Sequence, residues 1–282
     1  MINRDSELAG RFWENSRVPD CPILDFHAHM GPFYGGYLPV DTAETMVGAM
    51  DEAGVALTCF VSHNALYAPA TGRSEDLSAA LRFPDRLKAY HIVCSHALCP
   101  EEDLQRIREN RAAYVGFKFH PSTYKVPLSA AQHRPYWAFA NENRLLVLSH
   151  TWGGSQYDGP EEAEKILREY PDLVLLAGHS FHGSWSEAVK LAERYPNLYL
   201  ELTAVLDDRG ALDFLVSHLG SERILFGVDQ PWFAYHHGIG AVLSARLTDE
   251  DRRNIFYRNG MKVLARFPWF ADIRQKNAGS LS

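Results

Sequence analysis

The sequence of 282 residues has little of what marks disulfide-rich, membrane-bound or nucleic-acid-binding proteins. Its four cysteines, Cys21, Cys59, Cys94 and Cys99, form no CxxC pair, so free thiols in a reducing compartment are expected. No run approaches the ~18 apolar residues of a membrane span. No basic stripe accompanies the net charge of −7, which argues against nucleic acid and anionic membrane surfaces as partners. Because residues 1–19 also lack the apolar core of a signal peptide, a cytoplasmic protein is predicted.

Common nucleotide-binding motifs are missing as well. No GxGxxG turn follows the first predicted strand, no P-loop is present, and no repeat of ~20–50 residues or linker-like composition is found. With 46% hydrophobic residues the chain has enough apolar surface for a sizeable core. A single globular domain spanning residues 1–282 is therefore predicted.

What the sequence does contain is a regular alternation of strand and helix patterns. Eight short apolar or β-branched runs are each followed by a helical pattern, which is typical of an α/β protein with a closed (β/α)8 TIM barrel. An open doubly wound sheet is the structural alternative. The predicted strands cover residues 23–30, 56–63, 89–96, 114–120, 145–150, 173–179, 198–203 and 224–229.

Histidines gather at the ends of these predicted strands, where TIM barrels carry their active sites. Seven of the 13 histidines and one aspartate stand there: His27, His29, His63, His96, His120, His150, His179 and Asp229. Strand alternation places His27 and His29 on one face and turns Lys118, His120 and Asp229 inward. Buried charges need a partner, and a metal ion is one that imidazole and carboxylate groups bind well. The alternative is a set of buried polar residues that are only hydrogen-bonded.

His27, His29, His150 and Asp229 would supply three imidazoles and a carboxylate, and leave one coordination position for water. Zinc is the predicted ion, with iron and manganese as alternatives, in one or two copies. Asp229 or His179 is the predicted catalytic base.

Five segments in this order resemble the amidohydrolase superfamily, in particular the amidohydrolase-related branch that includes aminocarboxymuconate-semialdehyde decarboxylase. They are the His-Ala-His of residues 27–29, the GFKFHP of 116–121, the LSH of 148–150, the AGH of 177–179 and the FGVDQP of 226–231. The resemblance extends over about residues 22–267 and includes the Asn259 that begins a closing apolar helix. It implies a distorted barrel in which His27, His29, His150 and Asp229 hold a divalent ion. His179 would then bind a second ion, or position water or substrate in a mononuclear site.

Several other inward residues are candidates for the metal or the substrate. The resemblance leaves two roles for Lys118, a carboxylated bridge between two ions or a residue that binds no metal. His120 also lies on the inward face and departs from the resemblance. His63, His96 and His120 either line the pocket or are core histidines that are hydrogen-bonded to the backbone, which is the commoner case. Glu201 shares a face with Tyr199 and Thr203 and is predicted to support a ligand histidine.

Aromatic residues follow the strands and suit an apolar or ring-bearing organic substrate. The predicted pocket residues are Phe33, Tyr34, Trp152, Trp185 and Trp232. The alternative is that these rings only anchor long loops, or become buried in a homodimer.

Three functions are compatible with this pattern. The first is a metal-dependent hydrolase that uses metal-activated water on an amide, lactone, ester or thioester carbonyl. The second is a lyase, a metal-dependent, non-oxidative decarboxylase of an aromatic or enoic acid. The third is a binding protein that has kept the barrel and lost catalysis, against which the intact set of candidate ligands argues.

Overall fold

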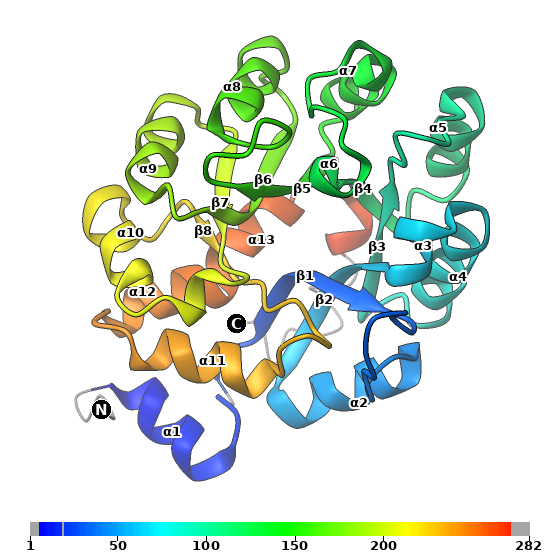
Figure 1. The fold of residues 1–282 in the computed structure, drawn as a ribbon. Coiled ribbons are helices and arrows are strands. Elements are labelled where there is room, and N and C mark those ends of the chain that lie inside the picture. Colours follow the sequence, from blue (N-terminus) through cyan, green and yellow to red (C-terminus); the bar gives the residue numbers. More distant parts are fainter. Residues whose placement is uncertain (1–5, 19, 272–282) are drawn as a thin grey trace.

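The computed structural model describes residues 6–18 and 20–271. At its centre eight parallel strands are hydrogen-bonded in sequence order, from the first to the eighth (Figure 1). This order confirms the predicted TIM barrel, because a doubly wound sheet reverses its strand order at a switch point. The strands are β1 Ile23–Met30, β2 Val55–Ser62, β3 Leu87–Ile92, β4 Tyr114–Phe119, β5 Leu146–Trp152, β6 Val174–His182, β7 Leu198–Glu201 and β8 Ile224–Leu225.

The barrel closes through an irregular segment rather than through a full eighth strand. Only two residues of the predicted strand 224–229 form β8. Beyond it, the Phe26 N–H donates to the Phe226 carbonyl at 3.0 Å, and the Asp229 N–H donates to the His27 carbonyl at 2.8 Å. The segment 226–230 therefore lies directly against β1 and carries Asp229 to the side of the two strand-one histidines.

Helices surround the barrel on its outside (Figure 1). Those in the strand–helix alternation are α2 Ala43–Ala53, α4 Pro69–Arg82, α5 Pro100–Glu109, α7 Arg134–Glu142, α8 Pro160–Glu169, α9 Trp185–Arg194 and α10 Ala211–Leu219. Shorter elements at the strand ends are α3 His63–Tyr67, α6 Pro121–Tyr124, and the 3-10 turns Ala131–His133 and Val205–Asp207. Among the described residues, no helix has the length and apolar character needed to cross a membrane.

Besides the short α3 and α6, two helices were not predicted from the sequence. The first, α1 (Glu7–Asn15), precedes the barrel and is capped by Ser6. The second, α11 (Tyr235–Ser244), contains Gly238 and Gly240, which lower its helix propensity. Gly238 is needed there for packing, since a Cβ at this position would lie 2.6 Å from a methyl group of Val228.

The helical pattern of the sequence predicts one long closing helix over about residues 249–265, and the structure has a helix there that is not regular. It consists of α12 (Asp249–Arg253), a π-helical turn (Asn254–Arg258) and α13 (Asn259–Leu264). Asn259 donates from its side chain to the carbonyls of Ser221 and Ile224, at 2.7 and 2.8 Å. This residue therefore ties the closing helix to the start of β8.

The alternation of β4 shows how one strand serves both the core and the barrel interior. Phe117 and Phe119 point outward, and Phe119 stacks on Trp137 of α7 with ring centroids 4.3 Å apart. Lys118 points inward and is fully buried. Each buried phenylalanine contributes roughly 1.5–3 kcal/mol, which offsets the cost of placing an amine inside the barrel.

Asp76 on α4 offers a test of how burial couples stability to pH. Its Oδ1 accepts from the Ser62 N–H at 2.9 Å, whereas its buried Oδ2 has no partner, and burial raises the pKa of this carboxyl from 3.8 to about 8. Between these values the native state retains a proton that the unfolded chain has lost, so stability falls as the pH rises. In urea unfolding, the free energy of unfolding of Asp76→Asn minus that of wild type should rise by on the order of 3 kcal/mol between pH 5 and pH 8. A difference that does not change with pH would contradict this prediction.

Candidate metal and substrate site

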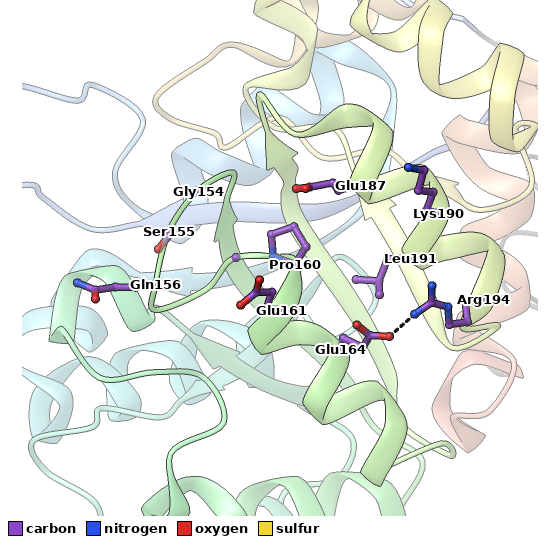
Figure 2. A pocket seen from close by; sticks show the side chains of 11 residues that line it. Gly154, Ser155, Gln156, Pro160, Glu161, Glu164, Glu187, Lys190, Leu191 and Arg194 are labelled. Atoms are coloured by element: carbon purple, nitrogen blue, oxygen red, sulfur yellow. Dashed lines mark hydrogen bonds and ion pairs between the residues drawn. The ribbon is translucent and has the colours of Figure 1, made fainter.

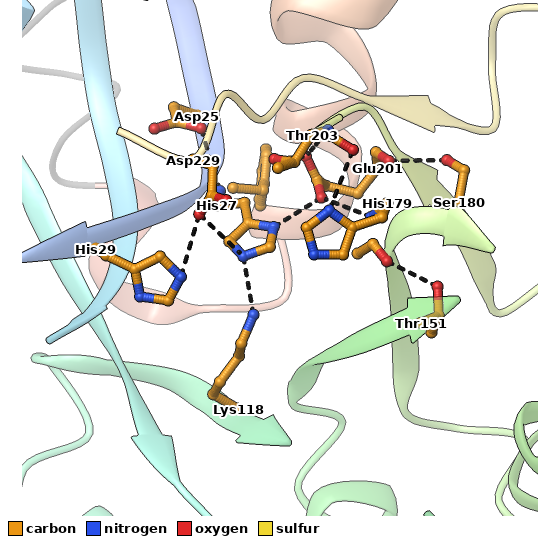
Figure 3. A network of polar contacts seen from close by, with 12 residues as sticks. Asp25, His27, His29, Lys118, Thr151, His179, Ser180, Glu201, Thr203 and Asp229 are labelled. Carbon is orange, nitrogen blue, oxygen red and sulfur yellow. Dashed lines mark hydrogen bonds and ion pairs between the residues drawn. The ribbon is translucent and has the colours of Figure 1, made fainter. Parts of the chain in front are cut away.

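Three side chains meet where β1 and the segment after β8 lie together (Figure 3). His27 and His29 come from β1, and Asp229 follows β8 with a left-handed backbone at φ 63°. Asp229 Oδ1 lies 3.1 Å from His29 Nε2 and 3.6 Å from His27 Nε2. Among the described residues these three form the one group of histidine, cysteine or acidic residues whose ligand atoms all lie within 4.8 Å of one another.

The other ring nitrogen of each histidine decides what this group can bind. His29 Nδ1 lies 3.0 Å from the Val61 carbonyl, and His27 Nδ1 lies 2.8 Å from Glu201 Oε2. Both oxygens accept hydrogen bonds, so each histidine carries its proton on Nδ1 and presents a lone pair at Nε2. Two lone pairs and a carboxylate oxygen therefore converge, an arrangement that is favourable only with a cation close by.

Asp229 supports this conclusion. Its buried Oδ1 has no hydrogen-bond partner. It faces the Nε2 atoms of both rings, and with both rings neutral this arrangement is favourable only when a cation lies close by. The residues thus fit a divalent ion by number, type and charge.

Glu201 lies inside the barrel, as predicted, and supports two histidines at once. It is fully buried, and its Oε2 accepts from His27 Nδ1 and from the His179 N–H. Its Oε1 accepts from the N–H and the hydroxyl of Thr203, both at 2.7 Å. Burial raises its pKa, yet four donors occupy both oxygens and leave no place for a proton.

The end of β6 has an unusual backbone that faces the same space. His179, Ser180 and Phe181 all have positive φ values, between 49° and 70°, which cost energy in residues other than glycine. Thr151 accepts from the Phe181 N–H at 3.0 Å, and Ser180 donates to the Glu201 carbonyl at 2.8 Å. These contacts hold His179 beside His27, with ring centroids 5.2 Å apart (Figure 3).

Lys118 is the cation nearest to the converging lone pairs. Its Nζ lies 2.9 Å from His27 Nε2, and burial lowers its pKa to about 8 (Figure 3). The amine donates to the same nitrogen that would bind a metal. An ion at His27 therefore requires that Lys118 turn away from Nε2.

His150 and His179, predicted as further ligands, lie beside the three-residue group but are not part of it. Their rings are 4.8 Å apart, and the ring of His120 stacks on His150 at 4.3 Å. His179 Nδ1 faces the Thr203 carbonyl at 3.3 Å, so its Nε2 also carries a lone pair. The structure thus places these three predicted residues together as a second imidazole group.

The two remaining histidines differ in position. His63 stacks on His29 at 4.9 Å, gives its Nδ1 proton to the Gly31 carbonyl and accepts from Trp232 Nε1 at 2.9 Å. Burial lowers the pKa of His63 to about 4, so it stays neutral and fixes the Trp232 ring. His96 was wrongly placed at a strand end, because β3 stops at Ile92. It lies four residues further on and is exposed.

The predicted aromatic residues form two groups, one on each side of the histidines. Phe33 contacts Tyr34, His63 and Trp232 on the side of His29, with ring centroids 4.6 to 5.4 Å apart. Trp152 lies 5.8 Å from His179 on the other side and stacks on His182, which contacts Trp185. Tyr34 is 84% exposed and Trp232 44%, so the first group reaches the surface.

One residue of this site was missed in the sequence. Asp158 lies in the loop after β5, and its Oδ2 is 2.8 Å from His150 Nδ1. The surrounding Gly153–Gly159 segment shows no periodicity, so no strand or helix pattern indicated where Asp158 points. Only the folded position of the loop reveals the contact.

A separate cavity of about 470 Å³ lies outside the barrel, between the loop after β5 and helices α8 and α9 (Figure 2). It is lined by charged side chains, and the ion pair between Glu164 and Arg194 crosses it. None of the predicted site residues lines this cavity. This cavity is therefore separate from the histidine site inside the barrel.

Comparisons with known proteins give one family and a set of structural relatives. The family model described as Amidohydrolase matches residues 34–266, whereas no curated protein matches the chain. An uncharacterised TIM-barrel protein from Bordetella bronchiseptica superposes with a TM-score of 0.70, at 20% identity over 87% of this chain and 99% of that one.

Two further relatives are decarboxylases by their descriptions. A 2,6-dihydroxybenzoate decarboxylase from Rhizobium has a TM-score of 0.66, at 15% identity over 89% of this chain and 99% of that one. A dihydroxybenzoic acid decarboxylase from a Polaromonas species, with bound manganese and the inhibitor 2-nitroresorcinol, has a TM-score of 0.65. It is 15% identical over 87% of this chain and 97% of that one. At these identities the likeness shows a shared fold.

The four hydrogen bonds of Glu201 predict a large cost for removing its charge. In Glu201→Gln an amide N–H₂ replaces one oxygen and faces two N–H or O–H donors, so the free energy of unfolding should fall by roughly 2–4 kcal/mol. Urea unfolding measures it. The exposed Glu187→Gln is the control and should stay within about 0.5 kcal/mol of wild type. Equal effects of both substitutions would contradict the role given to Glu201.

Proposed function

Because the chain belongs to the amidohydrolase family, we propose that it is an enzyme that uses one divalent metal ion to release carbon dioxide from an aromatic carboxylic acid. The observation that carries the proposal is the convergence of His27 Nε2, His29 Nε2 and the unpartnered Asp229 Oδ1. These three residues would hold the ion. A bound divalent ion supplies concentrated positive charge that orients and polarises the oxygen atoms of a substrate.

Manganese and zinc both suit this donor set. Manganese is the ion named for the Polaromonas decarboxylase, and zinc is the ion predicted from the ligand types. His150, predicted from the sequence as a further ligand, lies beside these residues, and its removal tests whether it binds the ion. His179 then faces the substrate and is available for hydrogen bonding and proton transfer.

The site suits an aromatic acid in two ways. Rings on both sides, Phe33 and Trp232 on one and Trp152 on the other, provide surfaces for a flat substrate. Lys118 is a buried amine within the network, and once it turns away from His27 it can pair with a carboxylate. The descriptions of the decarboxylase relatives add support for phenolic acids as the substrate class.

The reaction needs a proton in the place of the departing group. The bond between the ring carbon and the carboxyl carbon breaks, carbon dioxide leaves, and the ring carbon gains a hydrogen. The Nε2 atoms of His150 and His179 carry lone pairs, because their Nδ1 atoms face Asp158 and the Thr203 carbonyl. His179 Nε2 would therefore first take a proton from a water molecule and then give it to the ring carbon, and the hydroxide would return to solvent. The pocket is largely closed to solvent around His179, which is 8% exposed.

Hydrolysis of a carbonyl compound is the second candidate. The observation that favours it is the ionised Asp229, a carboxylate positioned to accept a proton from water. Only the substrate and product distinguish the two reactions, since hydrolysis consumes water and releases no carbon dioxide.

The metal proposal predicts one ion per chain. In elemental analysis of purified protein, the wild type and His150→Ala should each retain about one equivalent, whereas His27→Ala and Asp229→Asn should lose it. Lys118→Met should bind the ion at least as tightly, because the competing amine is gone. Two ions per chain that fall to one or none without Lys118 would instead indicate a carboxylated lysine and favour hydrolysis. Loss of metal in His150→Ala would add His150 to the ligands.

The substrate proposal predicts carbon dioxide release from phenolic acids. Protein loaded with Mn²⁺ or Zn²⁺ should convert 2,6-dihydroxybenzoate or a related carboxylated phenol to the phenol with one equivalent of carbon dioxide. Asp229→Asn should lower this rate by at least about 100-fold. Turnover of esters, lactones or thioesters without carbon dioxide release would replace the proposal by hydrolysis. No turnover of either class would favour a binding protein.

A further inference from the structure

The strand that carries His27 and His29 has a β-bulge beside them. Between Asp25 and Ala28 the register of β1 against β2 shifts by one residue. An extra residue of this kind lies outside the regular ladder, bends the strand and changes the direction of the side chains that follow. The bulge therefore helps to set where the two imidazoles point, and its backbone N–H groups need acceptors that the ladder does not supply.

Asp25 provides an acceptor inside the bulge. Its side chain is fully buried, and its Oδ1 accepts from the His27 N–H at 3.1 Å (Figure 3). The same carboxyl interacts with the backbone N–H of Val228, in the segment after β8. Val228 directly precedes Asp229 in the chain. One side chain thus contacts the backbone of one candidate ligand and the backbone of the residue before another.

The joint between β1 and the segment after β8 is not a regular sheet. Ala28 and Gln230 form an isolated bridge there, and the Asp229 N–H donates to the His27 carbonyl at 2.8 Å. Because no continuous ladder joins the two segments within the described residues, side-chain contacts across the joint have more influence on how His27 and Asp229 lie relative to each other. The Asp25 carboxyl makes such a contact.

We propose that Asp25 is a positioning residue for the metal site, whose carboxyl accepts backbone N–H groups on both sides of the joint and thereby holds His27 and Asp229 at the spacing that one divalent ion needs. Ligand atoms bound to one tetrahedral ion at about 2.0–2.2 Å lie roughly 3.5 Å from each other. His27 Nε2 and Asp229 Oδ1 are 3.6 Å apart, so a small movement of the joint would spoil the fit. The proposal rests on the metal ion of the proposed function and not on the reaction.

The Zn²⁺ affinity of the full-length protein, measured by competition with a chromophoric chelator, tests this role. Asp25→Ala removes the acceptor and should weaken Zn²⁺ binding by roughly 10–100-fold. Asp25→Asn keeps a carbonyl oxygen for the N–H groups and should stay within about 3-fold of wild type. The visible spectrum of the Co²⁺-loaded protein, which reports the coordination geometry, should change in Asp25→Ala and stay the same in Asp25→Asn.

The matched control is Asp76→Ala. Asp76 is another fully buried carboxyl that accepts a strand N–H, that of Ser62 at 2.9 Å, but it lies on α4. Both alanine variants should lower the urea midpoint, because each leaves a buried N–H without its acceptor. Only Asp25→Ala should lose Zn²⁺ affinity. If Asp25→Ala does not fold, Asp25→Leu takes its place, since leucine fills a similar space and offers no acceptor.

The outcomes separate this role from the proposed reaction. Zn²⁺ affinity that Asp25→Ala retains, or that Asp76→Ala loses to the same extent, overturns the positioning role. Loss of binding in Asp25→Asn also overturns it, because the acceptor is still present, as does a wild-type protein that binds no divalent ion. The expected pattern of affinities in a protein that releases no carbon dioxide from any aromatic acid keeps the positioning role and rejects the proposed reaction.

Discussion

The site depends on one repeated interaction, a histidine Nδ1–H donated to an oxygen of the protein. His27 gives this proton to Glu201, His29 to the Val61 carbonyl, and His179 to the Thr203 carbonyl. A neutral imidazole that donates its only N–H from Nδ1 has a lone pair at Nε2. Several Nε2 lone pairs thus point into one space while the rings stay uncharged. Burial maintains this state, because it keeps the pKa values of His27 and His179 well below the ordinary value.

Closure of the barrel explains why Asp229 joins these rings. A regular eighth strand would run on through residues 226–229, but β8 ends at Leu225. The chain then follows β1 by separate hydrogen bonds and turns at Asp229, whose φ of 63° an aspartate tolerates better than most residues. The irregular end of the sheet therefore places the Asp229 carboxylate next to His29. Gly227 permits this path, since a Cβ there would lie 1.9 Å from Glu201 Oε1.

Alternation along strands is the signal that made most of the site predictable. It turned His27, His29, Lys118 and Glu201 inward, because each lies within a strand whose two faces differ clearly. The same rule failed where strands ended. It extended the third strand to His96, whereas β3 ends at Ile92 and His96 is exposed. It also could not place Asp158, whose loop has no period. Nor does any sequence pattern state which nitrogen of a histidine is bound, since that depends on acceptors far along the chain, such as Glu201 for His27.

Charge provides the last constraint on what the site can accept. Glu201 and Asp229 are ionised, whereas burial raises the pKa of Asp25 well above its ordinary value and keeps it neutral. Protonated Lys118 offsets one of these two negative charges, so a divalent ion at His27, His29 and Asp229 would bring the sum over these groups to about +1. Ionised Asp158, beside a neutral His150, lowers this sum to about zero. Buried charge is least costly when it is balanced, and the ion would supply that balance. The carboxylates and Lys118 therefore match a divalent ion, whereas the fit of a substrate depends on the aromatic rings at the mouth of the barrel.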